Sequence, residues 1–171
     1  MRIGQGAVPS VDVTDRITRD VGWVADRWLR ELRAGRAFGG SVQQIAAAGN
    51  APHTQLINPV GSLITVILYR VYATLSASGL TRLSHYNTAL TTNSAIVRNL
   101  ASGGAAPTGQ IRSQDNVAIL GSIFFALVNQ ANALIDFNIK WITELDAGEG
   151  VNLTNDAAAS TVTTSWFWIE V

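Results

Sequence analysis

Alternation of side-chain type over residues 133–145 is the feature that most restricts the fold of this chain. One face of the run would hold Ile135, Phe137, Ile139, Trp141, Thr143 and Leu145, and the other would hold Asp136, Asn138, Lys140, Ile142 and Glu144. A period of two is typical of a β-strand with one face on a core and the other in solvent. The run therefore predicts a strand and indicates a β protein.

Short extended segments bounded by turn residues fill most of the chain after residue 40. The segment 63–74 is apolar on both faces and rich in β-branched residues, which predicts a central strand, and the turn 58–62 before it contains proline and glycine. Further strands are predicted over 41–47, 53–58, 80–86, 95–100, 122–128, 151–154 and 161–171. Such a series predicts an all-β fold, a β-sandwich or jelly roll. Because such sheets leave free edges, we also expect a homo-oligomer.

Composition excludes several classes of protein. The chain has 171 residues, of which 47% are hydrophobic and 14% charged, enough for one domain with a core plus an appendage. The net charge of zero provides no broad basic field for nucleic acid or anionic lipid. No run reaches the roughly 18 apolar residues of a membrane span, and residues 1–6 lack a signal-peptide core. We therefore expect neither nucleic acid nor membrane as a partner.

Charge is concentrated at the front of the chain. Residues 1–40 contain seven of the twelve basic residues and five of the twelve acidic ones, and this segment ends in the glycine-bearing stretch 35–40. This contrast predicts two units, an N-terminal arm over 1–40 and a β-sandwich domain over 41–171.

An amphipathic helix is predicted over about residues 12–34 of the arm. Its apolar stripe consists of Val13, Ile17, Val21, Val24, Trp28 and Leu32, at spacings of three and four. Gly35 is the expected C-terminal stop. The helix could pack on its own β-domain, or it could insert into a neighbouring subunit or another protein. A membrane-surface helix is disfavoured, because the polar face holds nearly as many acids as bases.

Insertion of the helix into a neighbouring subunit or another protein would use a defined set of partner-binding residues. They are Ile17, Val21, Trp23, Val24, Arg27, Trp28, Arg30 and Leu32. We expect Trp23, Trp28 and Leu32 to act as anchors, and Arg27 and Arg30 to make contacts at the rim.

Residues that could act as metal ligands or catalytic groups are few. His53 and His85 have no neighbouring carboxylate or second ligand at a metal-binding spacing, so both are predicted to be surface or interface residues. Glu144, Asp146 and Glu149 surround one turn without the regular alternation of oxygen ligands of a calcium loop, which favours a solvated hairpin end.

The familiar catalytic motifs are also missing from the sequence. There is no nucleophile elbow and no glycine-rich loop placed to hold phosphate. Asn152–Thr154 matches a glycosylation acceptor, but no export signal accompanies it. We expect no catalytic residue, no metal and no cofactor, and therefore no enzyme.

Aromatic residues permit one further interpretation. Tyr69, Tyr72, Phe137, Trp141, Trp166 and Trp168 could line a sugar-binding face. Core and interface packing is the preferred interpretation, because these residues alternate within strands instead of gathering in polar loops.

Several short motifs resemble those of small virion structural proteins of tailed bacteriophages. The motifs are Val13–Gly22, the turn Ile57–Ser62 leading to Tyr69 and Arg70, the turn Ala147–Gly150, and Phe167–Val171. The chain departs from them at Val24–Arg36, which is predicted to form a longer helix. The resemblance implies an N-terminal anchoring segment and a β-sandwich, present in many copies on heads, collars or tails. It also implies that other virion proteins are partners and that the protein is located in the virion, after assembly in the host cytoplasm. A carbohydrate- or receptor-binding module of a phage particle is the alternative.

Overall fold

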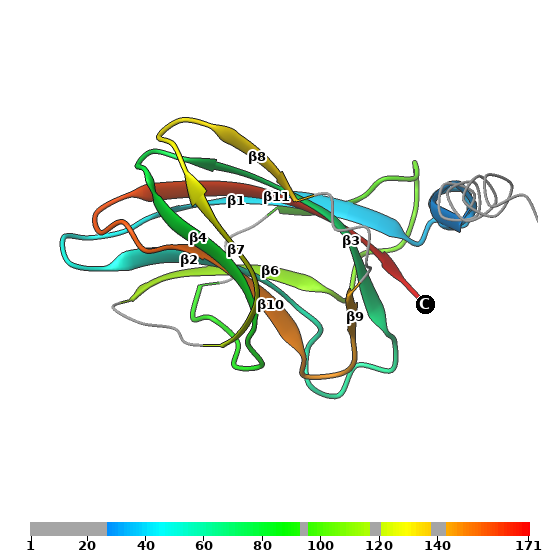
Figure 1. The fold of residues 1–171 in the computed structure, drawn as a ribbon. Helices are drawn as coiled ribbons and strands as arrows, with labels where there is room; N and C mark the ends of the chain where they lie inside the picture. The colour runs from blue at the N-terminus through cyan, green and yellow to red at the C-terminus, as the bar shows by residue number, and fades with distance from the viewer. Residues whose placement is uncertain (1–26, 93–95, 117–120, 138–142) are drawn as a thin grey trace, which may run out of the picture.

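The described residues of the computed structural model form a sandwich of two antiparallel sheets with one short helix at its end (Figure 1). The structure describes residues 27–92, 96–116, 121–137 and 143–171. The helix covers residues 27–33 within that part of the chain. The prediction of an all-β sandwich is confirmed.

Sheet A has the strand order β5-β1-β11-β3-β8, and β9 also pairs with β3. Its strands are β1 (Ala37–Ile45), β3 (Val66–Leu75), β5 (Ile96–Asn99), β8 (Leu134–Phe137), β9 (Thr143–Leu145) and β11 (Thr161–Glu170). Sheet B has the order β6-β2-β10-β4-β7. Its strands are β2 (Ala51–Ile57), β4 (Gly79–His85), β6 (Gln110–Asn116), β7 (Ser122–Asn129) and β10 (Gly150–Asn155).

The connectivity is that of a long hairpin rolled up on itself. β1 pairs with β11, β2 with β10, β3 with β8, and β4 with β7, so that early strands meet late ones in nested order. The pairs β11 with β3 and β10 with β4 then complete the two sheets. This nested arrangement is a jelly roll, to which β5 and β6 add one edge strand each.

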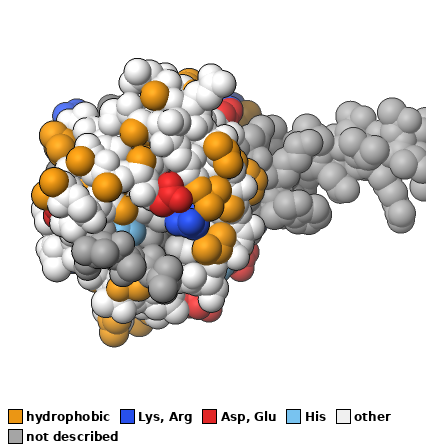
Figure 2. Space-filling view, turned by 60° about the vertical axis from the view of Figure 1, so that its left-hand side comes forward, with side chains coloured by type: hydrophobic (Ala, Val, Ile, Leu, Met, Phe, Trp, Pro, Cys, Tyr) orange, Lys and Arg blue, Asp and Glu red, His pale blue; other side chains and the backbone are white. Residues whose placement is uncertain are grey.

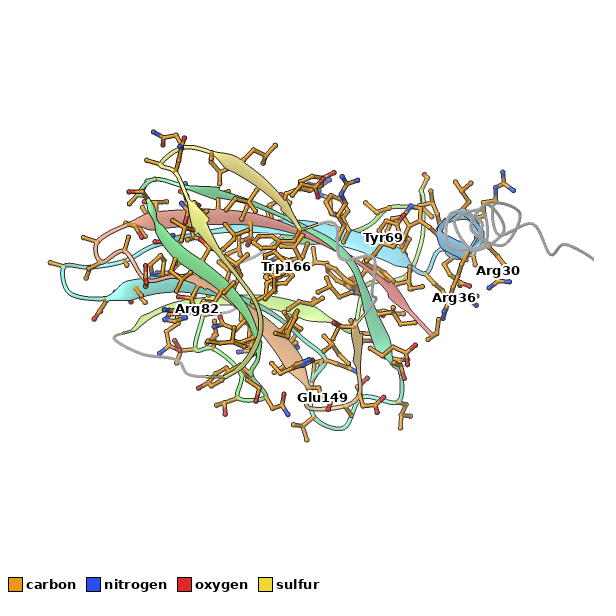
Figure 3. All side chains as sticks on the ribbon, viewed as in Figure 1. Arg30, Arg36, Tyr69, Arg82, Glu149 and Trp166 are labelled. Carbon is orange, nitrogen blue, oxygen red and sulfur yellow. The ribbon has the colours of Figure 1, made fainter. Side chains whose placement is uncertain are left out.

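Trp166 and Trp168 of β11 lie at the centre of the core and are fully buried. Val162 and Thr164 face the same way, while Phe167 and Ile169 lie on the outer face of sheet A. The core therefore forms where the inner faces of the two sheets meet (Figure 3).

Each predicted strand has a counterpart, with differences at the boundaries. The strand predicted over 133–145 appears as β8 and β9, and the residues between them lie outside the described part of the chain. β1 begins at Ala37, so the expected boundary between residues 40 and 41 falls within this strand. The sequence does not predict β6, because Ile111 is the one large apolar residue in Gln110–Asn116.

Candidate interaction surfaces

The helix ends at Gly35 in a Schellman motif. The N–H of Arg36 donates to the carbonyl of Glu31 at 2.9 Å, and the N–H of Gly35 donates to that of Leu32 at 3.1 Å. Gly35 has a φ of +71°, a conformation that glycine adopts without steric cost. The predicted helix stop is confirmed.

The described helix packs against the outer face of sheet A in its own chain. Trp28 stacks on Tyr69 of β3, with ring centroids 4.3 Å apart. Trp28 and Leu32 pack against a small buried cluster that consists of Ala37, Ile67 and Ile169. The sequence predicts these two side chains as anchors for a partner, but both contact their own sandwich. The cause is an apolar patch on the outer face, which forms only when β1, β3 and β11 are paired in register.

Glu31 lies between the helix and the sandwich and is buried. It accepts a hydrogen bond from Nε of Arg36 at 2.6 Å and pairs with Arg30 at 3.3 Å (Figure 3 labels both arginines). Burial opposes ionisation of the carboxyl group, but the hydrogen bonds and charges of the two arginines outweigh it and hold the pKa of Glu31 below its usual value. Arg30, predicted at the rim of a partner interface, thus has a partner within its own chain.

The remaining predicted partner-binding residues fall in two groups. Arg27 is half-buried in the first described turn of the helix. Ile17, Val21, Trp23 and Val24 lie outside the described residues.

An open groove of about 610 Å³ lies beside the helix on the outer face of sheet A. Its floor is β1 at Gly39 and Ser41, which pair with Arg98 and Ile96 of β5 on one side and with Phe167 and Ser165 of β11 on the other. Phe167, Leu100 and Ile96 give it apolar walls. Gly39 keeps the hollow open, since a Cβ atom there would lie 3.2 Å from the Phe167 ring and 3.3 Å from Leu100.

Among the described strands, β7 lies at one edge of sheet B, and four of its apolar side chains are exposed. They are Ile123, Phe124, Phe125 and Val128. Phe124 contacts the ring of His85, with ring centroids 4.9 Å apart, while Phe125 contacts Phe137 of β8. Figure 2 brings the left-hand side of Figure 1 forward and shows hydrophobic side chains in several groups with few charged ones.

The two histidines differ in their environments. His85 is exposed at the end of β4, as predicted, but the prediction for His53 is wrong because this residue is buried in β2. The loop after β4 covers this part of sheet B: Gln55 donates to the carbonyl of Tyr86 at 2.7 Å and accepts from the N–H of Leu90 at 3.0 Å. Asn152, the acceptor of the glycosylation motif, is also fully buried, in β10.

Acidic residues form no ion site in the described part of the chain. Glu149 accepts a hydrogen bond from the N–H of Asp146 at 2.9 Å, which closes the turn before β10. Among the described residues, no group of three or more His, Asp or Glu side chains could hold a metal ion.

The aromatic residues are divided between the core and the outer face of sheet A. Trp166 and Trp168 are fully buried and Phe137 nearly so, so core packing is confirmed for these three. Tyr72 is half-buried on the outer face and meets the edge of Phe167, while Arg70 lies over the Tyr72 ring and pairs with Asp136. Trp141 lies outside the described residues. A sugar-binding face cannot therefore include Trp166 or Trp168.

No described helix has the length and apolar character needed to cross a membrane. Comparisons of the chain with protein-family models, with curated proteins and with solved structures found no match.

Proposed function

We propose that this protein is a non-enzymatic structural subunit of a tailed-bacteriophage virion. Its sandwich assembles into a homo-oligomer, and its N-terminal arm attaches that oligomer to other virion proteins of the head, collar or tail. The motifs that resemble those of phage virion proteins support a role in a phage particle, and the edge strand β7 supports assembly into an oligomer.

The observation that carries this proposal is the chemistry of β7. Exposed strand edges are normally protected from pairing by charges or short length. Within the described strands, β5 is short and holds Arg98, β6 holds Arg112 and Asp115, and β8 is short and holds Asp136. β7 has eight residues, no charge and no proline. It is therefore the edge best suited to contact another subunit.

Light scattering on the purified protein tests assembly through β7. We expect a stable oligomer, and we expect Val128→Lys to dissociate it, because Val128 is 83% exposed and a lysine there would be desolvated at an interface. Val60→Lys is the matched control, since Val60 is 88% exposed in the turn between β2 and β3. A monomer at high concentration, or equal effects of the two variants, would contradict the proposal.

Incorporation into particles tests the virion role. Assembled particles containing this chain should lose it when residues 1–24 are deleted, while the sandwich of the truncated protein should remain folded by circular dichroism. Retention of the truncated protein in purified particles would exclude attachment through the arm.

A further inference from the structure

The helix crosses sheet A in a defined direction. Trp28 lies on Tyr69 of β3, whereas seven residues later the carbonyl of Gly35 accepts a hydrogen bond from Nδ2 of Asn99 in β5, at 2.7 Å. Figure 1 agrees, because the helix is seen nearly end-on while β1 and β11 run across the view. The N-terminal end of the described helix therefore lies over β3, and the groove lies towards the opposite edge of the sheet, between β1 and β5.

A helix continued in this direction would carry the upstream apolar stripe away from the groove of its own copy. The roughly 15 residues from Val13 to Trp28 would extend about 22 Å in such a helix. Among the described strands, one position lies beyond β3 in the order of sheet A, which adds about 5 Å of surface. Most of a continued stripe would extend past these strands and would need a surface on another molecule.

The groove has the chemistry to accept this stripe. Phe167, Leu100 and Ile96 form its apolar walls, and the bare backbone of Gly39 leaves room for an inserted side chain. The same face already binds a helix, through Trp28 and Leu32 of the same stripe. Residues 13–24 continue the same apolar stripe, so they are suited to bind in the groove on this face.

Charge is compatible with this occupant. Residues 13–24 contain two acidic side chains, Asp15 and Asp20, and two basic ones, a net charge of zero. Arg98 at the groove forms no ion pair with any described residue. Asp15 or Asp20 of the second copy would supply a carboxylate for this guanidinium group at the edge of an apolar contact.

We propose that the groove on the outer face of sheet A binds residues 13–24 of a second copy of this chain. Each copy thus lends its arm to a neighbour, and the arm holds the oligomer together as well as attaching it. This inference rests on the proposed function and specifies the molecule that the arm contacts.

Cysteine cross-linking tests the arrangement, because the chain has no cysteine of its own. One full-length chain carries Val21→Cys, and a second chain, with a size tag, carries Ile96→Cys. After coexpression and mild oxidation we expect a disulfide between tagged and untagged chains. The matched control is Ile45→Cys in place of Ile96→Cys, since these isoleucines are 65% and 72% exposed on neighbouring strands and only Ile96 lines the groove.

Two results would overturn the inference. One is a yield of mixed disulfide no greater than with Ile45→Cys, and the other is a disulfide within single chains when Val21→Cys and Ile96→Cys are combined. As a second measurement, Ile96→Asp should raise the protein concentration needed for half-assembly about tenfold, and Ile45→Asp should leave it unchanged.

These outcomes separate the inference from the proposed function. An oligomer that Val128→Lys dissociates, without specific cross-linking at Ile96, would leave the proposed function standing and refute the exchanged arm. A protein that stays monomeric at every concentration would refute both.

Discussion

Trp28 stacks on Tyr69 with the planes of the two rings inclined by 18°. This contact joins the helix to β3, a strand about 40 residues further along the chain. Beside it, Leu32 completes the cover over Ala37, Ile67 and Ile169. The helix from Trp28 onward is therefore part of the folded unit. An arm could leave the sandwich only at a residue that precedes Trp28.

Replacing Trp28 with alanine should destabilise the sandwich itself. We expect the free energy of unfolding to fall by about 1–3 kcal/mol, because a half-buried indole and its stacking partner lose contact area. Urea denaturation followed by circular dichroism measures the change. Leu29→Ala is the control, since Leu29 is 48% exposed on the same helix. Equal stability of the two variants would show that helix docking contributes nothing.

Acid should weaken the docking of the helix through Glu31. The pKa of Glu31 is lowered in the folded protein, so its contribution to stability is complete above the pKa of the unfolded chain, about 4.3, and is lost as the pH falls through the lower folded value. Stability measured from pH 6 to pH 3 should fall less steeply in Glu31→Gln than in the natural chain. Arg70 likewise lowers the pKa of Asp136, which leaves a residual slope in the variant. Identical slopes would contradict the assignment.

Gly35 should tolerate asparagine better than alanine. Its φ of +71° costs an L-residue with a Cβ atom about 1 kcal/mol, and asparagine accepts this conformation more readily. We expect the order of thermal stability to be glycine, asparagine, alanine. An alanine variant as stable as the natural chain would show that the Schellman motif does not hold the helix end.

A buried polar cluster should fix one end of the sandwich. Asn155 donates to Oδ1 of Asn129 at 2.8 Å, and Thr81 donates to the same oxygen at 2.7 Å. Asn155→Ala removes one of these bonds and the acceptor for the N–H of Ala157, so we expect a loss of about 2–3 kcal/mol in urea denaturation. Gln130→Ala, at an exposed position in the adjacent turn, should change stability by less than about 0.5 kcal/mol. The reverse order of effects would refute a structural role for the cluster.

Local patterns in the sequence were sufficient to predict those elements that have a periodic or turn signal of their own. The period-two run over 133–145 predicts β8 and β9, the doubly apolar run predicts β3, and Gly35 predicts the end of the helix. β6 escaped prediction because an edge strand with one buried apolar side chain has almost no periodic signal.

The sequence by itself determined the all-β class, the end of the helix and the alternation that buries Trp166 and Trp168. Only the tertiary structure decided that Trp28 and Leu32 cover their own sheet, that His53 is buried, and that β7 has a free apolar edge. The physical reason is that burial and edge exposure depend on which strands pair and in which register. Those pairings join residues far apart in the chain, such as Gly39 with Phe167, and no local pattern encodes them.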